Sequence, residues 1–247
     1  MAFRSFVLSG AAIVQSAGRS ALIAALTLTS TPAFAQLRST ISSQELVGMD
    51  PLALARLVDE SRPTPVSAAA RAQVLAALPT QGVVRDLDDG ERRKLAGIAP
   101  VLEVAQRGSV YAIVVIDVPD AFVGLHERTV VLISRSALRA MSADELRGAL
   151  AHEAAHEYVQ EEYQRAQAED RRRRLQDLEL VCDILAVMTL RAIGQEARSL
   201  PAAIEKLQRF NRFHFGYKVD PDYPDVMLRR SIVLAFEKKI SRIAGRR

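Results

Sequence analysis

The chain has 247 residues and a formal net charge of +4, from 33 Lys and Arg against 29 Asp and Glu. Its hydrophobic content of 49% allows a packed core, and its 5% of aromatic residues, with no Trp, require a largely aliphatic one. The small excess of positive charge excludes nucleic acid as an expected partner, because such binding needs a strong basic patch.

The first 35 residues differ in composition from the rest. They contain no Asp or Glu and carry charge only at Arg4 and Arg19, and an apolar stretch at 21–28 precedes the small residues Ala33 and Ala35. This order is typical of a secretory signal peptide. We therefore predict a signal peptide over 1–35, cleaved after Ala35, and a periplasmic or secreted protein. An uncleaved membrane anchor is the alternative, although the apolar stretch is short for a bilayer.

Residues 36–84 are predicted to form a helical N-terminal segment. Two Ala- and Leu-rich stretches, 44–60 and 66–78, are separated by Pro63 and Pro65, which break a continuous helix. The sequence leaves open whether this segment is an appendage, a pro-segment, an inhibitor or a wrap around the main domain.

Residues 85–247 are predicted to form an α+β, mostly α domain with a small β-sheet. β-branched residues favour strands at 110–117 and 129–134, while 118–126 is expected to be irregular and contains Pro119, which suits a sheet edge. Helices are predicted at 88–106 with a break near Gly97 and Pro100, at 146–159, at 175–193, at 200–215 and from 226 onward.

Three smaller features lie within this domain. Ser142 and Glu145 form a capping-box pattern that would start the helix at 146–159. The lone Cys182 lies in an apolar helical run and is predicted to be a buried thiol rather than a reactive one. The run Arg171 to Arg174 is predicted to be a solvated linker or helix end, with contact to a membrane surface as the alternative.

The helix at 146–159 contains the pattern His-Glu-x-x-His at His152, Glu153 and His156. Side chains four residues apart lie on one face of a helix, so both imidazoles can reach one Zn²⁺ ion. Glu153 would lie at the edge of that site, where it can take a proton from a bound water. A metal also explains polar groups in an apolar helix, because it satisfies both histidines.

A zinc peptidase site needs a third protein ligand and one open position. Glu179 and Asp183 lie four apart in the next apolar helix, which predicts Glu179 as the third ligand and Asp183 as a carboxylate that orients a ligating His. Competing candidates for the third ligand are Glu169, Asp170, Asp177 and His214.

Together these residues resemble the HtpX and CAAX-prenyl-endopeptidase type family of gluzincin zinc metallopeptidases over roughly residues 85–235. The resemblance rests on the stretch VVLISRSALRAMSADELRGALAHEAAH and on the later Glu179-x-x-x-Asp183. It implies one zinc ion per chain, with Glu153 as the catalytic base. It also implies an edge segment at 118–123, with Asp120, Ala121 and Phe122, on which substrate lies as an added strand.

The chain departs from that family in several ways. Ala155 replaces a common Gly, and the gap between His156 and Glu179 is short and lacks a long helical insert. Tyr223, Pro224 and Arg229 match the spacing of a His-Pro followed by Arg, with Tyr in place of His. Tyr223 and Arg229 are therefore candidates for stabilising the charged intermediate, although each could equally be structural.

The sequence thus predicts an exported zinc metalloendopeptidase that acts on proteins or peptides. By resemblance alone, misfolded envelope proteins are the expected substrates. The first alternative is a zinc-containing chaperone-like or binding module with a latent or inactive peptidase fold, and the second is a metal-free interaction protein. The sequence does not indicate an oligomeric state.

Overall fold

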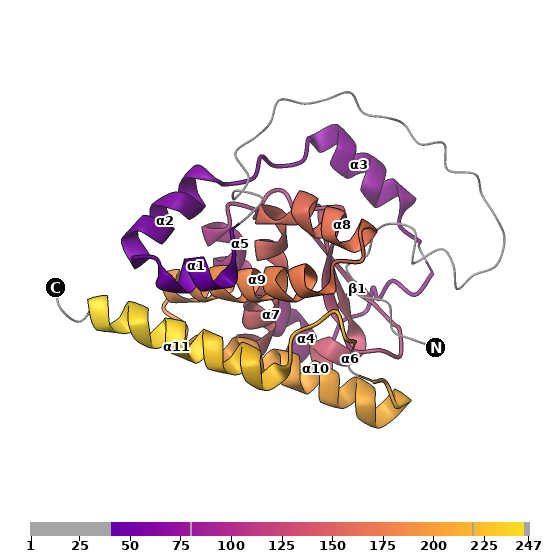
Figure 1. Ribbon diagram of the computed structural model, residues 1–247. Helices are drawn as coiled ribbons and strands as arrows, with labels where there is room; N and C mark the ends of the chain where they lie inside the picture. The colour runs from indigo at the N-terminus through magenta and orange to yellow at the C-terminus, as the bar shows by residue number, and fades with distance from the viewer. Residues whose placement is uncertain (1–40, 80, 219, 245–247) are drawn as a thin grey trace.

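The computed structural model describes residues 41–79, 81–218 and 220–244, so the predicted signal peptide lies outside the described residues. The chain is mostly helical with a three-stranded sheet, which confirms the predicted fold class (Figure 1). The elements are α1 (Ser43–Gly48), α2 (Pro51–Glu60), α3 (Ala68–Ala77), α4 (Asp89–Ala96), α5 (Ala99–Val104), β1 (Ala112–Ile116), β2 (Val123–His126), β3 (Val130–Ser134), α6 (Arg135–Ala140), α7 (Ala143–Ala155), η1 (His156–Tyr158), α8 (Gln160–Ala168), α9 (Arg172–Ala192), α10 (Ser199–Phe215) and α11 (Val226–Ala244).

The sheet has the order β1-β3-β2, with β1 parallel and β2 antiparallel to the central strand β3. Both predicted strands are present. The expectation of irregular structure over 118–126 was wrong in its second half, because β2 pairs with β3 from Val123 to His126. This strand is short and contains Gly124, so its sequence carries little strand propensity, and its pairing with buried β3 decides its conformation.

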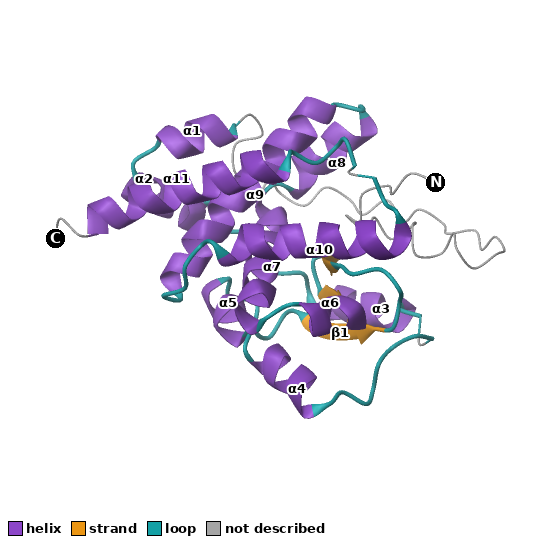
Figure 2. Ribbon diagram, turned by 90° about the horizontal axis from the view of Figure 1, so that it is seen from below, coloured by secondary structure: helices purple, strands orange, loops and turns teal. Residues whose placement is uncertain are grey.

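The two faces of β3 are both buried, as expected for a central strand. Val131 and Ile133 point into the main helical core, whereas Val130 and Leu132 point to the opposite face. There they meet apolar residues of α3 and the turn after it, including Leu75. Helix α3 therefore covers the outer face of the sheet, whereas the other face packs against the main helical core. Figure 2 shows the strands confined to one part of a mostly helical molecule.

Helix α7 lies at the centre of the helical body and packs against α9 and α10. It begins at the predicted capping box, in which the Ser142 hydroxyl accepts from the Glu145 amide and Glu145 bonds back to the Ser142 amide. Gly148 lets α10 approach closely, since a Cβ on it would lie only 2.8 Å from the Leu200 backbone nitrogen.

The N-terminal helices pack into the same core. Leu46 of α1 and Leu54 of α2 are fully buried in it, and the Ser43 hydroxyl donates to Asp177 of α9 at 2.6 Å. The break that Pro63 and Pro65 impose separates α2 from α3 as the sequence predicts.

Glu157 anchors the connection between α2 and α3 to the end of α7. This buried carboxylate accepts from Arg107 and Arg128 and from the Tyr111 hydroxyl. The two guanidinium groups in turn donate to the carbonyls of Pro63 and Thr64, at 2.7 Å each. Buried charges need such partners, so this network explains why Glu157 follows His156 in an apolar stretch.

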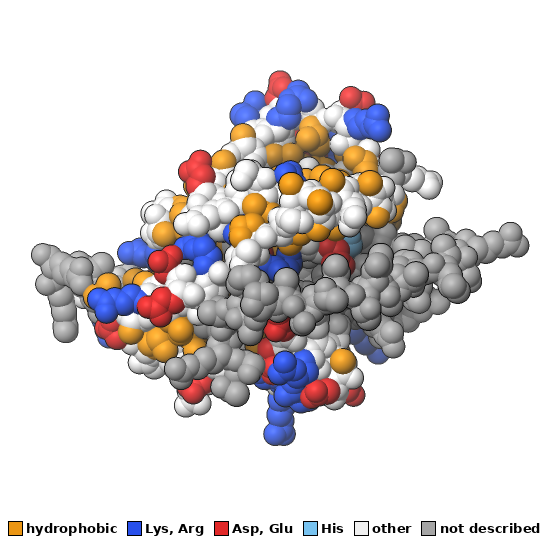
Figure 3. All heavy atoms as spheres, turned by 90° about the horizontal axis from the view of Figure 1, so that it is seen from above, with side chains coloured by type: hydrophobic (Ala, Val, Ile, Leu, Met, Phe, Trp, Pro, Cys, Tyr) orange, Lys and Arg blue, Asp and Glu red, His pale blue; other side chains and the backbone are white. Residues whose placement is uncertain are grey.

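Charge on the surface is mixed in sign, and on the face seen in Figure 3 basic and acidic side chains lie near one another. The predicted Arg-rich run lies at the start of α9, where Arg171 and Arg174 both pair with Glu162. Among the described residues, we find no helix with the length and apolar character that a membrane span requires.

Gly148→Ala should destabilise the protein by about 1–3 kcal/mol, because the added methyl group would overlap the backbone of α10. Urea unfolding followed by circular dichroism measures this change. Gly48→Ala is the matched control, since a Cβ there meets nothing within 4 Å. If both variants unfolded at the wild-type urea concentration, the close contact between α7 and α10 would be disproved.

Glu91→Gln should destabilise the protein at neutral pH and much less in acid. Hydrogen bonds from Arg135 and Arg139 lower the pKa of Glu91 from 4.5 to about 2, against the opposing effect of burial. Its stabilisation is therefore present above pH 4.5 and is lost as the pH falls toward 2. Because Arg139 is exposed and solvent screens it, we expect about 1 kcal/mol at pH 7. Urea midpoints at pH 7 and pH 3 test this, and an equal loss at both would contradict it.

Candidate metal centre

Helices α7 and α9 bring three possible metal ligands together in the interior. His152 lies near the end of α7, His156 follows it as the C-cap, and Glu179 lies on α9. Their ligand atoms all lie within 4.8 Å of one another, and all three side chains are buried. Nε2 of His152 is 3.2 Å from Nε2 of His156 and 3.2 Å from Oε2 of Glu179. The other carboxylate oxygen of Glu179, Oε1, is 3.7 Å from Nε2 of His156.

This triangle fits a zinc ion. Two ligand atoms bound at about 2.0–2.1 Å in a tetrahedron lie roughly 3.3 Å apart, close to the separations observed. Oε2 of Glu179 is also buried without a hydrogen-bond partner. An unsatisfied buried carboxylate oxygen is costly, and a cation held between it and the two imidazoles would satisfy it.

Each ligand has its own supporting contact. Asp183 accepts from Nδ1 of His152 at 3.0 Å, which leaves Nε2 free to face the triangle. The Tyr163 hydroxyl donates to Oε1 of Glu179 at 3.1 Å, and burial raises the pKa of this hydroxyl, so it remains a donor. The Cys182 sulfur lies 3.6 Å from Nδ1 of His156 and is fully buried, as its position in an apolar run predicted.

Arg229 of α11 binds Asp183, the carboxylate that supports His152. Its guanidinium donates to both oxygens of Asp183, from Nε at 2.8 Å and from Nη2 at 2.7 Å. The same Nη2 lies 3.6 Å from Oε2 of Glu179. Burial alone would raise the pKa of Asp183, but the charge of Arg229 lowers it, so Asp183 stays ionised.

Glu153 lines a cavity of about 190 Å³ beside the triangle, together with His152, Tyr223 and Arg229. Burial is the main cause that raises the pKa of Glu153 from 4.5 to about 7, and its carboxylate also accepts from the Leu125 amide of β2 at 3.2 Å. A carboxylate with a pKa near neutrality can take up and release protons at physiological pH.

The predicted edge segment borders the same cavity. Ala121 and Phe122 line it, and Phe122 is joined to β3 through its carbonyl, which accepts from the Ser134 amide. Asp120 is held from two sides, since its carbonyl accepts from Ser136 and its carboxylate accepts from the Tyr217 hydroxyl. The amide and carbonyl of Ala121 both bind the side chain of Asn211.

The competing ligand candidates lie outside the triangle. Asp177 binds Ser43 and Arg174, and His214 is exposed on α10 among aromatic residues. Glu169 and Asp170 are exposed residues between α8 and α9. The sequence did not predict Tyr163, Asn211 or the supporting contact of Cys182, because only the folded chain brings these residues to their partners.

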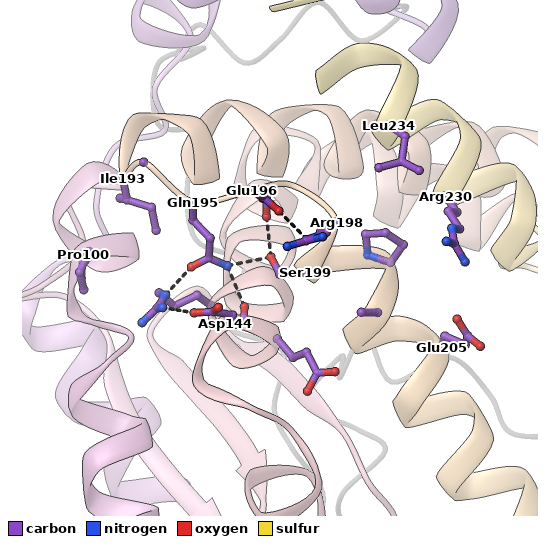
Figure 4. A pocket seen from close by; sticks show the side chains of 15 residues that line it. Pro100, Asp144, Ile193, Gln195, Glu196, Arg198, Ser199, Glu205, Arg230 and Leu234 are labelled. Atoms are coloured by element: carbon purple, nitrogen blue, oxygen red, sulfur yellow. Dashed lines mark hydrogen bonds and ion pairs between the residues drawn. The ribbon is translucent and has the colours of Figure 1, made fainter. Parts of the chain in front are cut away.

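A larger cavity of about 730 Å³ opens elsewhere, between the start of α7, the α9–α10 connection and α11. Figure 4 shows how its polar groups bind one another: the Gln195 amide donates to the Asp144 carbonyl at 2.9 Å and to the Ser199 hydroxyl at 2.7 Å. None of the three ligand residues lines this cavity, so it is separate from the candidate metal centre. Its hydrogen bonds link the start of α7 to the start of α10.

Tyr163→Phe should weaken zinc binding by about tenfold while leaving the fold intact, because it removes only the hydroxyl that orients Glu179. Competition with a fluorescent zinc chelator measures the affinity. Tyr158→Phe, a half-buried Tyr in η1, is the matched control and should bind zinc like the wild type. Equal affinities in the two variants would show that the Tyr163 hydroxyl does not support the centre.

Comparison with protein families matches residues 91–209 to peptidase family M48. The matched region includes the ligand triangle, Glu153 and the whole sheet, whereas Tyr223 and Arg229 lie beyond it. Comparison with curated proteins gave no match. The match of residues 91–209 to this family, whose members are metallopeptidases, confirms the predicted resemblance to gluzincins of the HtpX and CAAX-prenyl-endopeptidase type.

Proposed function

We propose that this protein is a zinc-dependent metalloendopeptidase with His152, His156 and Glu179 as the zinc ligands. The observation that carries this proposal is the buried triangle of three ligand atoms, with the carboxylate of Glu153 on the wall of the adjoining cavity. Structural zinc sites usually have four protein ligands. The described residues supply three ligands here, which favours a catalytic centre over a closed structural one.

Zinc held by this triangle would act as a Lewis acid that lowers the pKa of a bound water and polarises a substrate carbonyl. A side chain of the protein transfers the proton. Glu153 takes the proton of the attacking water at its carboxylate and delivers it to the leaving amine. Asp183, fixed by Arg229, holds His152 in the tautomer that presents Nε2. Tyr223, on the cavity wall, is the proposed donor to the developing oxyanion.

The outer edge of β2 is the proposed binding site for the substrate backbone. Along a strand of an antiparallel pair, the N–H and C=O of one residue both point toward the partner strand, and those of the next residue both point away from it. The Phe122 and His126 carbonyls accept from Ser134 and Thr129, on the β3 side. Ala121, Val123 and Leu125 therefore face outward, and the contacts of Ala121 with Asn211 and of Leu125 with Glu153 agree with this. A peptide strand can add along this edge beside the centre.

We further propose that the protein is exported and acts on unfolded proteins of the cell envelope. The composition of residues 1–35 supports export, and the edge site supports unfolded substrates. Only an extended chain can pair its backbone with a strand edge, so a folded domain would have to open first.

Glu153→Gln should abolish proteolysis of an unfolded protein such as reduced casein, because an amide cannot accept the proton of the attacking water. It should retain stoichiometric zinc, measured by atomic absorption, since Glu153 is outside the ligand triangle. Glu161→Gln, an exposed change on α8, is the control and should cleave like the wild type. Undiminished cleavage by Glu153→Gln would refute the proposed role of Glu153.

A further inference from the structure

The outward-facing backbone of Ala121 is already occupied by a side chain. Its amide donates to Oδ1 of Asn211 at 2.8 Å, and its carbonyl accepts from Nδ2 of Asn211 at 2.9 Å. Asn211 belongs to α10, ninety positions away along the chain. Its carboxamide uses one N–H donor and its carbonyl acceptor here, and these match the two groups of a peptide unit. Asn211 thus binds Ala121 as a residue of an added strand would bind it.

Packing along α10 decreases after Phe210, which still contacts the main core and precedes Asn211. The first turns of α10 are firmly packed, with Leu200 and Ala203 fully buried and Leu200 close to Gly148. The last turn is exposed, and Phe213 keeps 84% of its surface accessible. Sparse packing of this kind allows a helix end to move away while its beginning stays in place.

A second side chain fastens the loop that follows α10 to the same segment. The helix ends at Gly216, whose left-handed φ of 64° suits a glycine, and Tyr217 then donates to the Asp120 carboxylate at 2.9 Å. Asn211 and Tyr217 both line the cavity that also contains Glu153. Hydrogen bonds from these two residues therefore join the end of α10 and its loop to the edge segment at the candidate cleft.

We propose that Asn211 is a specificity-determining residue that competes with the substrate strand for the backbone of Ala121. This inference rests on the proposed endopeptidase function and concerns access to the same site. A long extended peptide must displace Asn211 before it pairs with Ala121, and its additional backbone hydrogen bonds compensate for those that are broken. A short peptide that does not reach Ala121 binds without this displacement.

The test compares two peptides in chains that bind but do not cleave. Both peptides share the same four central residues, and only the ten-residue peptide extends far enough to pair along the edge. The dissociation constant of each is measured by fluorescence anisotropy in zinc-loaded Glu153→Gln protein, with and without Asn211→Ala. Removing the competitor raises the fraction of binding-competent protein, so we expect about tenfold tighter binding of the long peptide. Binding of the short peptide should not change.

Two further variants make the result interpretable. Arg209→Ala changes an exposed residue of α10 and should leave the affinities of both peptides unchanged. Tyr217→Phe removes the hydroxyl that contacts Asp120 and should tighten binding of the long peptide by a smaller factor. If Asn211→Ala fails to fold, Tyr217→Phe decides. Hydrogen exchange gives an independent readout, because the Ala121 amide should exchange faster in Asn211→Ala.

Unchanged or weaker binding of the long peptide in Asn211→Ala would overturn this inference and make Asn211 a structural or substrate-supporting residue. Equal tightening for both peptides would also overturn it, because the effect would then not depend on reaching Ala121. Both measurements are independent of cleavage. A chain that binds peptides as expected but never hydrolyses them would refute the proposed enzyme and leave the competition intact.

Discussion

The buried ion pair between Asp183 and Arg229 is the interaction on which the metal centre depends. Glu179 and Asp183 are fully buried, and Glu153 lies with His152 and Arg229 on the wall of the adjoining cavity. When all three carboxylates are ionised, Arg229 compensates for one of them, and a divalent cation would balance the other two. Arg229 comes from α11, close to the C-terminal end of the chain. Helix α11 is therefore required to balance the charge of the carboxylates on α7 and α9. The centre thus depends on contacts among three helices that are far apart in the chain.

The parts of the centre that the sequence predicts are those set by local geometry. His152 and His156 are one helical turn apart, and so are Glu179 and Asp183, so each pair shares a face wherever its helix lies. The structure places these faces against each other, as expected for polar groups that would otherwise be buried alone. The catalytic and ligand roles of these residues stay predictions.

The features that the sequence did not predict arise from contacts between residues far apart in the chain. Tyr111 meets Glu157 across 46 positions, and Asn211 meets Ala121 across 90. None of these residues belongs to a periodic pattern that would identify its partner. β2 was missed for a similar reason, because a four-residue strand with a central glycine depends on β3 and not on its own propensity.

The N-terminal helices and the centre are joined through the residue that follows the second histidine. Glu157 holds Arg107 and Arg128, and these guanidinium groups hold the Pro63 and Thr64 carbonyls between α2 and α3. Displacing that connection would take one carbonyl acceptor from each of the guanidinium groups of Arg107 and Arg128, which hold the Glu157 carboxylate next to His156. The segment before the sheet thus supports the end of α7 through Glu157, whereas α10 contacts the segment that leads into β2 through Asn211. Because α7 is held by this network and only the last turn of α10 is exposed, a movement that admits a substrate is expected at that turn rather than in α7.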